Sequence, residues 1–208
     1  MKKLITLAIA LIMMGGSMQA QETIQLPQPN MKMLKMKLGD ALKQRRSVRD
    51  YQAGKEITQE QLSTILWAAA GINDTKSGRL TTPTAVNMQD IKVYVCNDKG
   101  VWLFNAKENN LTKVTDTDLR PSMTARQQFV MDAPVNLLLV SDQTGRRVNE
   151  RYGAMDAGYV SQDIYLACAA MGLKTVARAM MDQDAVKKTL KLKDGVMPML
   201  NHPIGYGK

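Results

Sequence analysis

A nearly unbroken apolar run over residues 133–140 is the feature that most constrains how this chain folds. Five of the six residues from Val135 to Val140 are Val or Leu. A strand with one wet face alternates apolar and polar residues, whereas a strand buried on both faces does not. The run therefore predicts a central strand that is covered by other elements on both sides.

Further strands and helices are expected before and after this run. Alternation over residues 91–95, a turn at 97–100 and an apolar run at 101–104 predict an antiparallel hairpin, which residues 111–114 extend. Residues 175–180 and 196–200 read as additional extended segments. Apolar residues at helical spacing, with a capping box formed by Thr58 and Gln61 in the second case, predict helices at residues 33–44, 58–71, 158–171 and 182–190. No internal repeat or linker is found, so one three-layer α+β domain is expected over residues 21–208.

The first twenty residues have the pattern of a secretory signal peptide. Lys2 and Lys3 precede an apolar run over residues 4–14, and a cleavage site follows after Ala20 or, alternatively, after Ser17. The run is too short to span a bilayer as a permanent anchor. No cysteine lies near the cut to carry a lipid. We therefore expect an exported, periplasmic protein without stable membrane insertion, with a signal peptide at 1–20 and the domain at 21–208.

Charge and composition exclude several functions. The formal net charge is +9, and it falls to +7 if Lys2 and Lys3 are removed with the signal peptide. The basic residues are scattered and aromatic residues make up only 5% of the chain, so nucleic-acid binding is not expected. A phosphate-bearing cofactor and an anionic membrane surface are better explanations for part of the positive excess.

Few residues are available for acid–base, thiol or metal chemistry. His202 is the only histidine, and it precedes Pro203, where a turn or packing role is expected. Cys96 and Cys168 fit small apolar core positions, and a disulfide between them stays an open alternative. No Cys-x-x-Cys motif or histidine cluster is present, so no metal site is expected.

Two segments carry the recognition chemistry. The first holds Arg45, Arg46, Ser47 and Arg49, and guanidiniums with a hydroxyl make charge-assisted, forked hydrogen bonds to a phosphate. The second, residues 83–89, adds short polar side chains and backbone groups that suit the edge of a flat heteroaromatic ring. Read alone, the arginines are equally compatible with a solvated basic face.

Taken in order with three later segments, these two resemble the nitroreductase family of FMN-dependent oxidoreductases. The resemblance runs from about Leu38 to the end of the chain. The later segments are residues 132–135, the helix from Asp156 with its end at residues 171–176, and residues 203–208. The resemblance implies a three-layer α+β fold with a central mixed, mainly antiparallel sheet flanked by helices. It also implies a homodimer that binds FMN at the subunit interface.

The resemblance also implies which residues contact the flavin. By position, the cofactor-binding residues are Arg45, Arg46, Ser47 and Arg49 at the phosphate, ribityl chain and ring edge, Pro83, Thr84, Ala85 and Asn87 from the other subunit, Ala177, Arg178 and Ala179 beside the ring, and Gly205 and Lys208 at the phosphate. No dedicated catalytic side chain is expected, because the cofactor carries the chemistry. Arg178 either stabilises negative charge on the reduced flavin or is a surface residue at a strand end.

Two departures from the family pattern leave the substrate class open. Ala179 and Met180 stand where the family has Glu and Gly, and Gln89-Asp90 stands where Gln-Pro-Trp is common. The function implied is electron or hydride transfer through FMN to a nitroaromatic, quinone or similar small acceptor, with NAD(P)H as a candidate donor. The alternatives are a flavin enzyme of another reaction type, such as azoline oxidation, dehalogenation or flavin breakdown, and an exported non-redox flavin-binding protein. Export argues against a reaction in which NAD(P)H is the direct electron donor, because NAD(P)H is a cytoplasmic metabolite.

Overall fold

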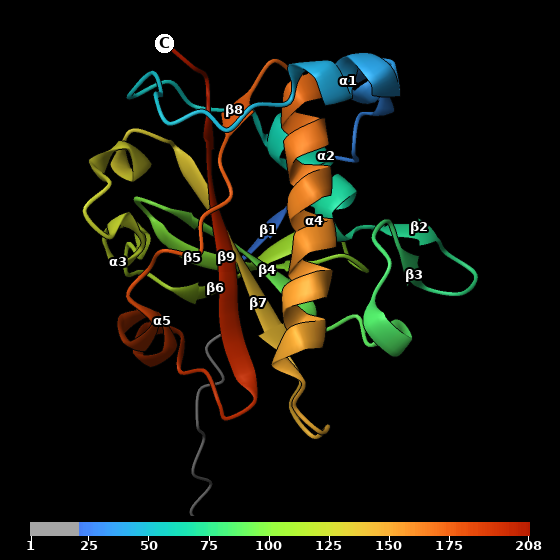
Figure 1. Ribbon diagram of the computed structural model, residues 1–208, viewed down its shortest axis with the longest axis vertical. Helices are drawn as coiled ribbons and strands as arrows, with labels where there is room; N and C mark the ends of the chain where they lie inside the picture. Colours follow the sequence, from blue (N-terminus) through green and yellow to red (C-terminus); the bar gives the residue numbers. More distant parts are fainter. Residues whose placement is uncertain (1–20) are drawn as a thin grey trace, which may run out of the picture.

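A seven-stranded sheet forms the centre of the computed structural model, which describes residues 21–208 (Figure 1). The signal peptide expected over residues 1–20 lies outside the described residues. The strands lie in the order β1-β6-β5-β4-β7-β9-β8, and every neighbouring pair is antiparallel. Their bounds are β1 Thr23–Gln25, β4 Ile91–Asn97, β5 Gly100–Asn105, β6 Asn110–Thr115, β7 Val135–Asp142, β8 Lys174–Thr175 and β9 Val196–Gly205. The mainly antiparallel sheet and the hairpin of β4 and β5 are confirmed.

The apolar run becomes the middle of this sheet. All residues of β7 except Asp142 are buried, and β4 and β9 pair with it on either side. Successive side chains of a strand point to opposite faces. Accordingly, Leu137 and Leu139 belong to one core cluster, whereas Leu138 and Val140 belong to the other.

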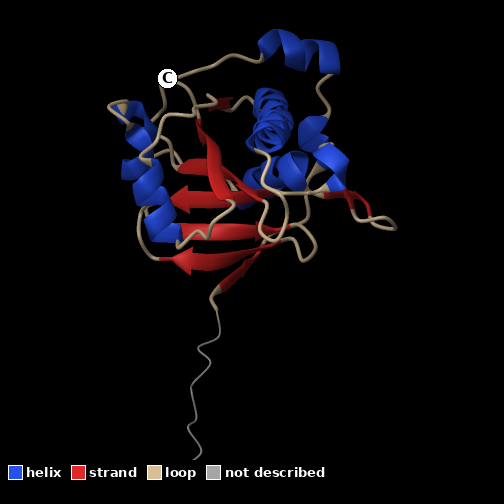
Figure 2. Ribbon diagram, turned by 60° about the horizontal axis from the view of Figure 1, so that its bottom comes forward, coloured by secondary structure: helices blue, strands red, loops and turns tan. Residues whose placement is uncertain are grey.

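Helices cover both faces of the sheet and complete three layers (Figure 2). One face is packed by α2 Gln59–Ala70 and α4 Glu150–Ala170, with α1 Leu38–Gln44 lying against α4. The other face is packed by α3 Arg120–Thr124 and α5 Gln183–Leu190. Short 3₁₀ turns are η1 Met31–Leu34, η2 Ala85–Asn87 and η3 Gln128–Met131, and a small hairpin is formed by β2 Ile72–Asp74 and β3 Arg79–Leu80. The three-layer α+β fold is therefore confirmed.

Local sequence signals explain where several helices begin. The predicted capping box is present at α2: the Thr58 hydroxyl accepts from the Gln61 N–H at 3.0 Å, and the Gln61 side chain accepts from the Thr58 N–H at 2.9 Å. Asp182 caps α5 by accepting from the Ala185 N–H at 3.0 Å. These side chains satisfy N–H groups that have no partner inside the helix.

Three expected boundaries were wrong. The helix expected from residue 33 begins only at Leu38, because Lys37 has an extended backbone and the preceding residues form η1. The helix expected from residue 158 begins at Glu150, because the Asn149 side chain caps it there. The strand expected over residues 175–180 ends at Thr175, and beyond it only Arg178 makes a single bridge, to Asn201.

The two cysteines are both buried and unbonded. Cys96 belongs to the α3–α5 side of the sheet and Cys168 to the α2–α4 side, so the sheet separates them and the disulfide alternative was wrong. Their predicted role as small core residues is confirmed. Within residues 21–208, no helix combines the length and apolar character that a bilayer crossing requires.

Candidate functional site

The arginine segment lies at one edge of the sheet, between β8 and the C-terminal tail. Ser47 pairs with Thr175, and the Val48 N–H donates to the Thr175 carbonyl at 3.0 Å. Tyr51 pairs with Gly207 on the other side of the segment. The fold therefore brings the predicted residues 45–49 together with the predicted residues 205–208.

Tyr165 of α4 connects this segment to the next predicted one. Its hydroxyl lies 2.8 Å from the Ser47 hydroxyl and accepts from the Ala177 N–H at 2.8 Å. The Arg45 guanidinium lies 5.1 Å from the centre of the Tyr165 ring. Sequence reasoning missed Tyr165, although an aromatic residue with a polar tip, one position after the buried Ile164, was a usable signal.

The arginines of this edge have no carboxylate partner. Within residues 21–208, no ion pair involves Arg45, Arg46 or Arg49. Arg46 donates to the Lys43 and Arg45 carbonyls at 2.7 and 2.8 Å, near the end of α1. Lys208 pairs with Asp50 at 3.1 Å. The guanidiniums therefore keep donors and charge for an external anion.

A small cavity of about 40 Å³ lies beside this segment, at the C-terminal end of α4. Its lining includes Arg45, Arg46, Lys174 and Tyr165. Cavities of about 330 to 540 Å³ are lined by other residues and include none of residues 45–49. The cationic cavity has room for a small anionic group but not for a flavin ring.

Arg178 is buried, with 5% of its surface exposed, so its interpretation as a surface residue was wrong. Its guanidinium donates to the carbonyls of Met123 and Thr124 at 2.5 and 2.9 Å, and to the side chains of Gln127 and Asn201 at 2.9 and 2.8 Å. Burial lowers the pKa of the guanidinium. No carboxylate within residues 21–208 pairs with it, so its charge is balanced by these carbonyl oxygens and by the face of the Phe129 ring, whose centre lies 5.5 Å from the guanidinium.

His202 lies in β9 and forms part of the support beneath the site. It is fully buried, with Nδ1 3.1 Å from the Thr175 hydroxyl and Nε2 2.9 Å from the Ser161 hydroxyl. Burial lowers the pKa of His202 to about 3, so the ring is neutral. The expected packing role is confirmed, and the alternative of a turn was wrong.

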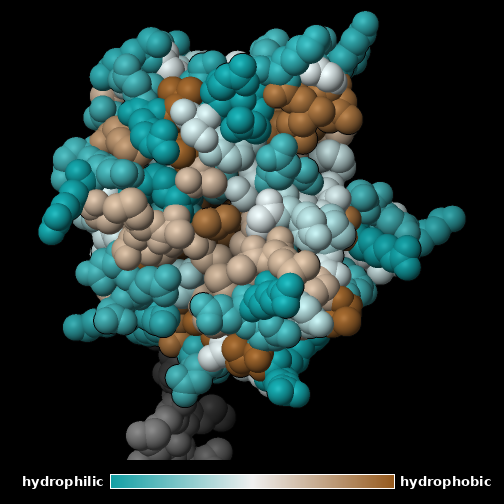
Figure 3. Space-filling view, in the orientation of Figure 1, coloured by the Kyte–Doolittle hydropathy of each residue, from teal (hydrophilic) through white to brown (hydrophobic). Residues whose placement is uncertain are grey.

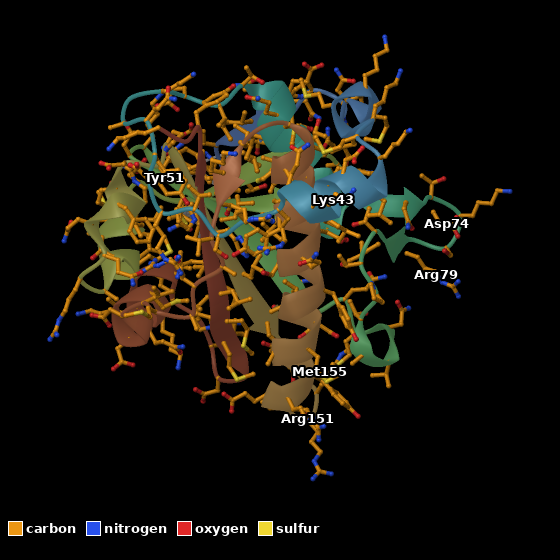
Figure 4. The ribbon with its side chains drawn as sticks, turned by 45° about the horizontal axis from the view of Figure 1, so that its top comes forward. Lys43, Tyr51, Asp74, Arg79, Arg151 and Met155 are labelled. Carbon is orange, nitrogen blue, oxygen red and sulfur yellow. The ribbon has the colours of Figure 1, made fainter. Side chains whose placement is uncertain are left out.

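The predicted residues 83–87 lie elsewhere. The Ala85 N–H donates to both carboxylate oxygens of Asp156, at 3.0 and 2.9 Å. Asp156 and Tyr165 are nine residues apart on α4, which separates them by about 14 Å along the helix. In Figure 4, Lys43 and Tyr51, which flank the arginine segment, lie away from Met155 and Arg151 at the other end of α4. One chain therefore brings together residues 45–49, 177–178 and 205–208, and it holds residues 83–87 apart from them.

Comparison with known proteins adds a family match to this geometry. The model of the nitroreductase family matches residues 42–206, a range that includes every predicted contact except Lys208. A protein of Methanocaldococcus jannaschii assigned as a nitroreductase is 30% identical, over 92% of this chain and 98% of its own length.

Solved structures agree in fold. A crystal structure from Ralstonia eutropha, assigned as a nitroreductase, has a TM-score of 0.82 at 30% identity and covers 91% of both chains. An FMN-dependent nitroreductase from Clostridium difficile has a TM-score of 0.60 at 19% identity, over 82% of this chain and 88% of its own. At that identity the second likeness concerns the fold alone.

Proposed function

The chain belongs to the nitroreductase family, and from that premise we propose that it is an FMN-dependent oxidoreductase. Membership supports a flavin-dependent oxidoreductase in general that acts on a small molecule, and FMN as the cofactor is our proposal. The observation that carries it is the edge formed by residues 45–49, where three guanidiniums and the Ser47 hydroxyl have no carboxylate partner within residues 21–208. Such an edge suits the phosphate of FMN.

The residues present fit this cofactor. Arg45, Arg46, Ser47 and Arg49 would hold the phosphate and ribityl end, with Gly205 and Lys208 closing the same edge. Tyr165 fixes the distance between Ser47 and the backbone of Ala177, which leads into Arg178 and Ala179. Bound FMN would supply hydride and single-electron transfer.

The protein's own contribution to the chemistry is electrostatic. Arg178 is a buried cation whose charge is balanced by carbonyl and amide dipoles and by the Phe129 ring, without a carboxylate partner within residues 21–208. A fixed positive charge in a site of low dielectric favours an electron-rich ring nearby. We assign no side chain as a proton donor or acceptor, since the only histidine is buried and neutral.

We further propose a homodimer with FMN at the subunit interface. Residues 83–87 lie too far along α4 to reach the arginine edge of their own chain, so Pro83, Thr84, Ala85 and Asn87 would contact the flavin of the partner subunit. The exposed side of α4 carries Tyr152, Met155 and Tyr159, which are 38%, 45% and 45% exposed. Figure 3 shows apolar and weakly polar residues across the middle of this side of the molecule, with hydrophilic residues around them. This is a surface suited to a second copy.

The reaction partners follow from the family only in outline. We propose a nitroaromatic, quinone or similar small molecule as acceptor and NAD(P)H as donor. We also propose that the protein is exported, because Lys2, Lys3 and the apolar run over residues 4–14 form a signal-peptide pattern. In the periplasm another reductant would be required. Anaerobic mixing with NADH or NADPH tests this, since a flavin that neither nucleotide bleaches would favour a different donor or one of the other flavin reactions.

Titration of FMN into the cofactor-free protein tests the site. We expect the double substitution Arg45→Ala and Ser47→Ala to weaken FMN binding at least about a hundredfold, because it removes a charge-assisted contact and a neutral one. Ser77→Ala with Arg79→Ala removes the same residue types at the same spacing from the exposed β2–β3 hairpin and should leave the affinity unchanged. Full FMN affinity in the first variant would overturn the site.

A further inference from the structure

Two buried carboxyl groups lie beneath the turn that the proposed function brings to the flavin of the partner. Asp90 and Asp156 are 2% and 1% exposed. They lie close together, because Asp90 is bonded to Ser141 and α4 packs against Ser141 at Gly153, one turn before Asp156. We propose that the pair shares one proton and that Asp156 is a positioning residue that holds the turn over residues 84–87 in its flavin-binding shape. The inference rests on the proposed function for the role of the turn.

The backbone of this turn has an unfavourable conformation, which a hydrogen bond from outside the turn stabilises. Val86, Asn87 and Gln89 have φ angles of 46°, 54° and 51°, in the left-handed region that residues other than glycine rarely occupy. Val86 is 80% exposed, so its own packing does not hold this conformation. The Ala85 N–H donates to both oxygens of Asp156, at 3.0 and 2.9 Å, which fastens the turn to α4.

Asp90 is the second carboxyl group of the pair, and two side chains fix its orientation. Its Oδ2 accepts from the Ser141 hydroxyl at 2.5 Å and from the Gln143 amide at 3.3 Å. Its Oδ1 is buried and has no hydrogen-bond donor within residues 21–208. α4 approaches β7 closely here: a Cβ atom added to Gly153 would lie only 2.6 Å from the Ser141 hydroxyl oxygen. A buried acceptor without a donor is costly, and a proton shared with Asp156 supplies that donor.

The charges around the pair agree with one shared proton. The pKa of Asp156 is raised to about 6. Burial is the largest cause and the nearby Asp90 carboxylate adds to it, whereas the bond from the Ala85 N–H lowers the pKa. Asp90 is the charged side chain that raises this pKa. Two other charged residues lie nearby, and both bond to the backbone. Lys92 donates to the Gln89 carbonyl at 3.4 Å, and the Asp142 N–H donates to the Asp90 carbonyl at 2.9 Å. Two ionised carboxylates in contact repel each other, so loss of the proton should loosen the pair and the turn above it.

The substitution Asp90→Asn makes this testable. Its amide offers Asp156 a permanent donor, while its carbonyl oxygen still accepts from Ser141 and Gln143. FMN affinity is measured for both proteins from pH 5 to pH 8. We expect the wild-type dissociation constant, divided by that of Asp90→Asn, to be near one at pH 5 and to rise at least about threefold by pH 8. The phosphate of FMN titrates at about pH 6, but this affects both proteins equally and cancels in the ratio.

A matched control lies on the same helix. Burial also raises the pKa of Asp163 to about 6, but this carboxyl lines a groove with Leu34 and Trp67 and has no bond to the turn. The ratio of wild type to Asp163→Asn should therefore stay constant with pH. A constant ratio for Asp90→Asn as well would overturn the shared proton.

Backbone hydrogen exchange of residues 84–89 in the FMN-free protein separates this inference from the proposed function. We expect Asp156→Ala to exchange at least about tenfold faster than wild type, relative to unstructured peptide rates. Asp156→Asn, which keeps one acceptor oxygen, should stay protected and serves if Asp156→Ala does not fold. Unchanged protection in Asp156→Ala would refute the positioning role. If wild type binds no FMN at any pH, the proposed function fails, and the exchange result still decides whether the pair holds the turn.

Discussion

At the scale of single residues, Tyr165 is the point on which the site depends most. It links a side chain from the arginine segment to a backbone N–H from the segment after β8. The arginines were identifiable from the sequence because charge and spacing are local properties. The hydrogen bonds of Tyr165 and the buried state of Arg178 were not, because both depend on partners from distant parts of the chain.

Tyr165→Phe removes one hydroxyl and leaves the Ala177 N–H without its partner. We expect a loss of about 1–3 kcal/mol in the free energy of unfolding and roughly tenfold weaker FMN binding, measured by denaturant titration and by FMN titration. Tyr94→Phe makes the same change on the α3–α5 side of the sheet, at a hydroxyl that has no hydrogen bond within residues 21–208, and should alter neither quantity. Equal behaviour of the two variants would contradict the role of Tyr165.

His202 should make stability depend on pH. Its pKa is lowered to about 3 by burial, whereas an unfolded histidine titrates at about 6.5. The unfolded chain therefore takes up a proton below about pH 6.5 that the folded chain does not, and folding loses stability as the pH falls. Between pH 7 and pH 5 we expect this group to cost about 2 kcal/mol.

The comparison variant is His202→Gln, with unfolding followed in denaturant at both pH values. The raised pKa values of Asp156 and Asp163 act in the opposite direction, since they make stability fall as the pH rises. Both proteins share those carboxyls, so the difference in slope isolates the histidine. Parallel pH profiles would show that His202 is not held neutral.

At the scale of elements, the sequence predicted best where a signal was local and complete. The run in β7 and the capping box of α2 needed no partner to be recognised. The start of α4 was missed because Tyr152, Met155 and Tyr159 are exposed apolar residues that obscure the helical pattern. The extended segment after β8 was overestimated, because its backbone pairs with β9 at only one further residue.

Thr58→Ala should weaken α2 at its first turn. Loss of the capping hydroxyl leaves the Gln61 N–H without a side-chain partner, and we expect a cost of about 1 kcal/mol in the free energy of unfolding. Thr58→Ser keeps the hydroxyl and should retain most of the stability. No difference between the alanine and serine variants would mean that the capping box contributes nothing measurable.

At the scale of the whole molecule, the proposed function places half of a flavin site near each end of α4. The arginine edge lies at the C-terminal end of the helix, and the turn held by Asp156 lies in its N-terminal half. Sequence resemblance suggested both halves and assigned them to different subunits, and the fold agrees with this by holding them apart within one chain. Two subunits related by a two-fold axis can complete both sites at once.

Heterodimers test this composite site. One subunit carries Arg45→Ala with Ser47→Ala, and the other carries Ala85→Pro, which removes the N–H bound by Asp156. Each homodimer should bind little FMN, whereas a heterodimer purified through two different tags has one intact site and should bind about one FMN per two subunits. If the heterodimer binds as little FMN as either homodimer, then the two halves belong to one chain or one of them is not part of the site.

The most direct test of the central claim is the visible absorption spectrum of the purified protein, with the released cofactor identified by mass. The account predicts a yellow protein that releases FMN, about one per subunit for a dimer with two equivalent sites. A colourless protein that also fails to take up added FMN would contradict it.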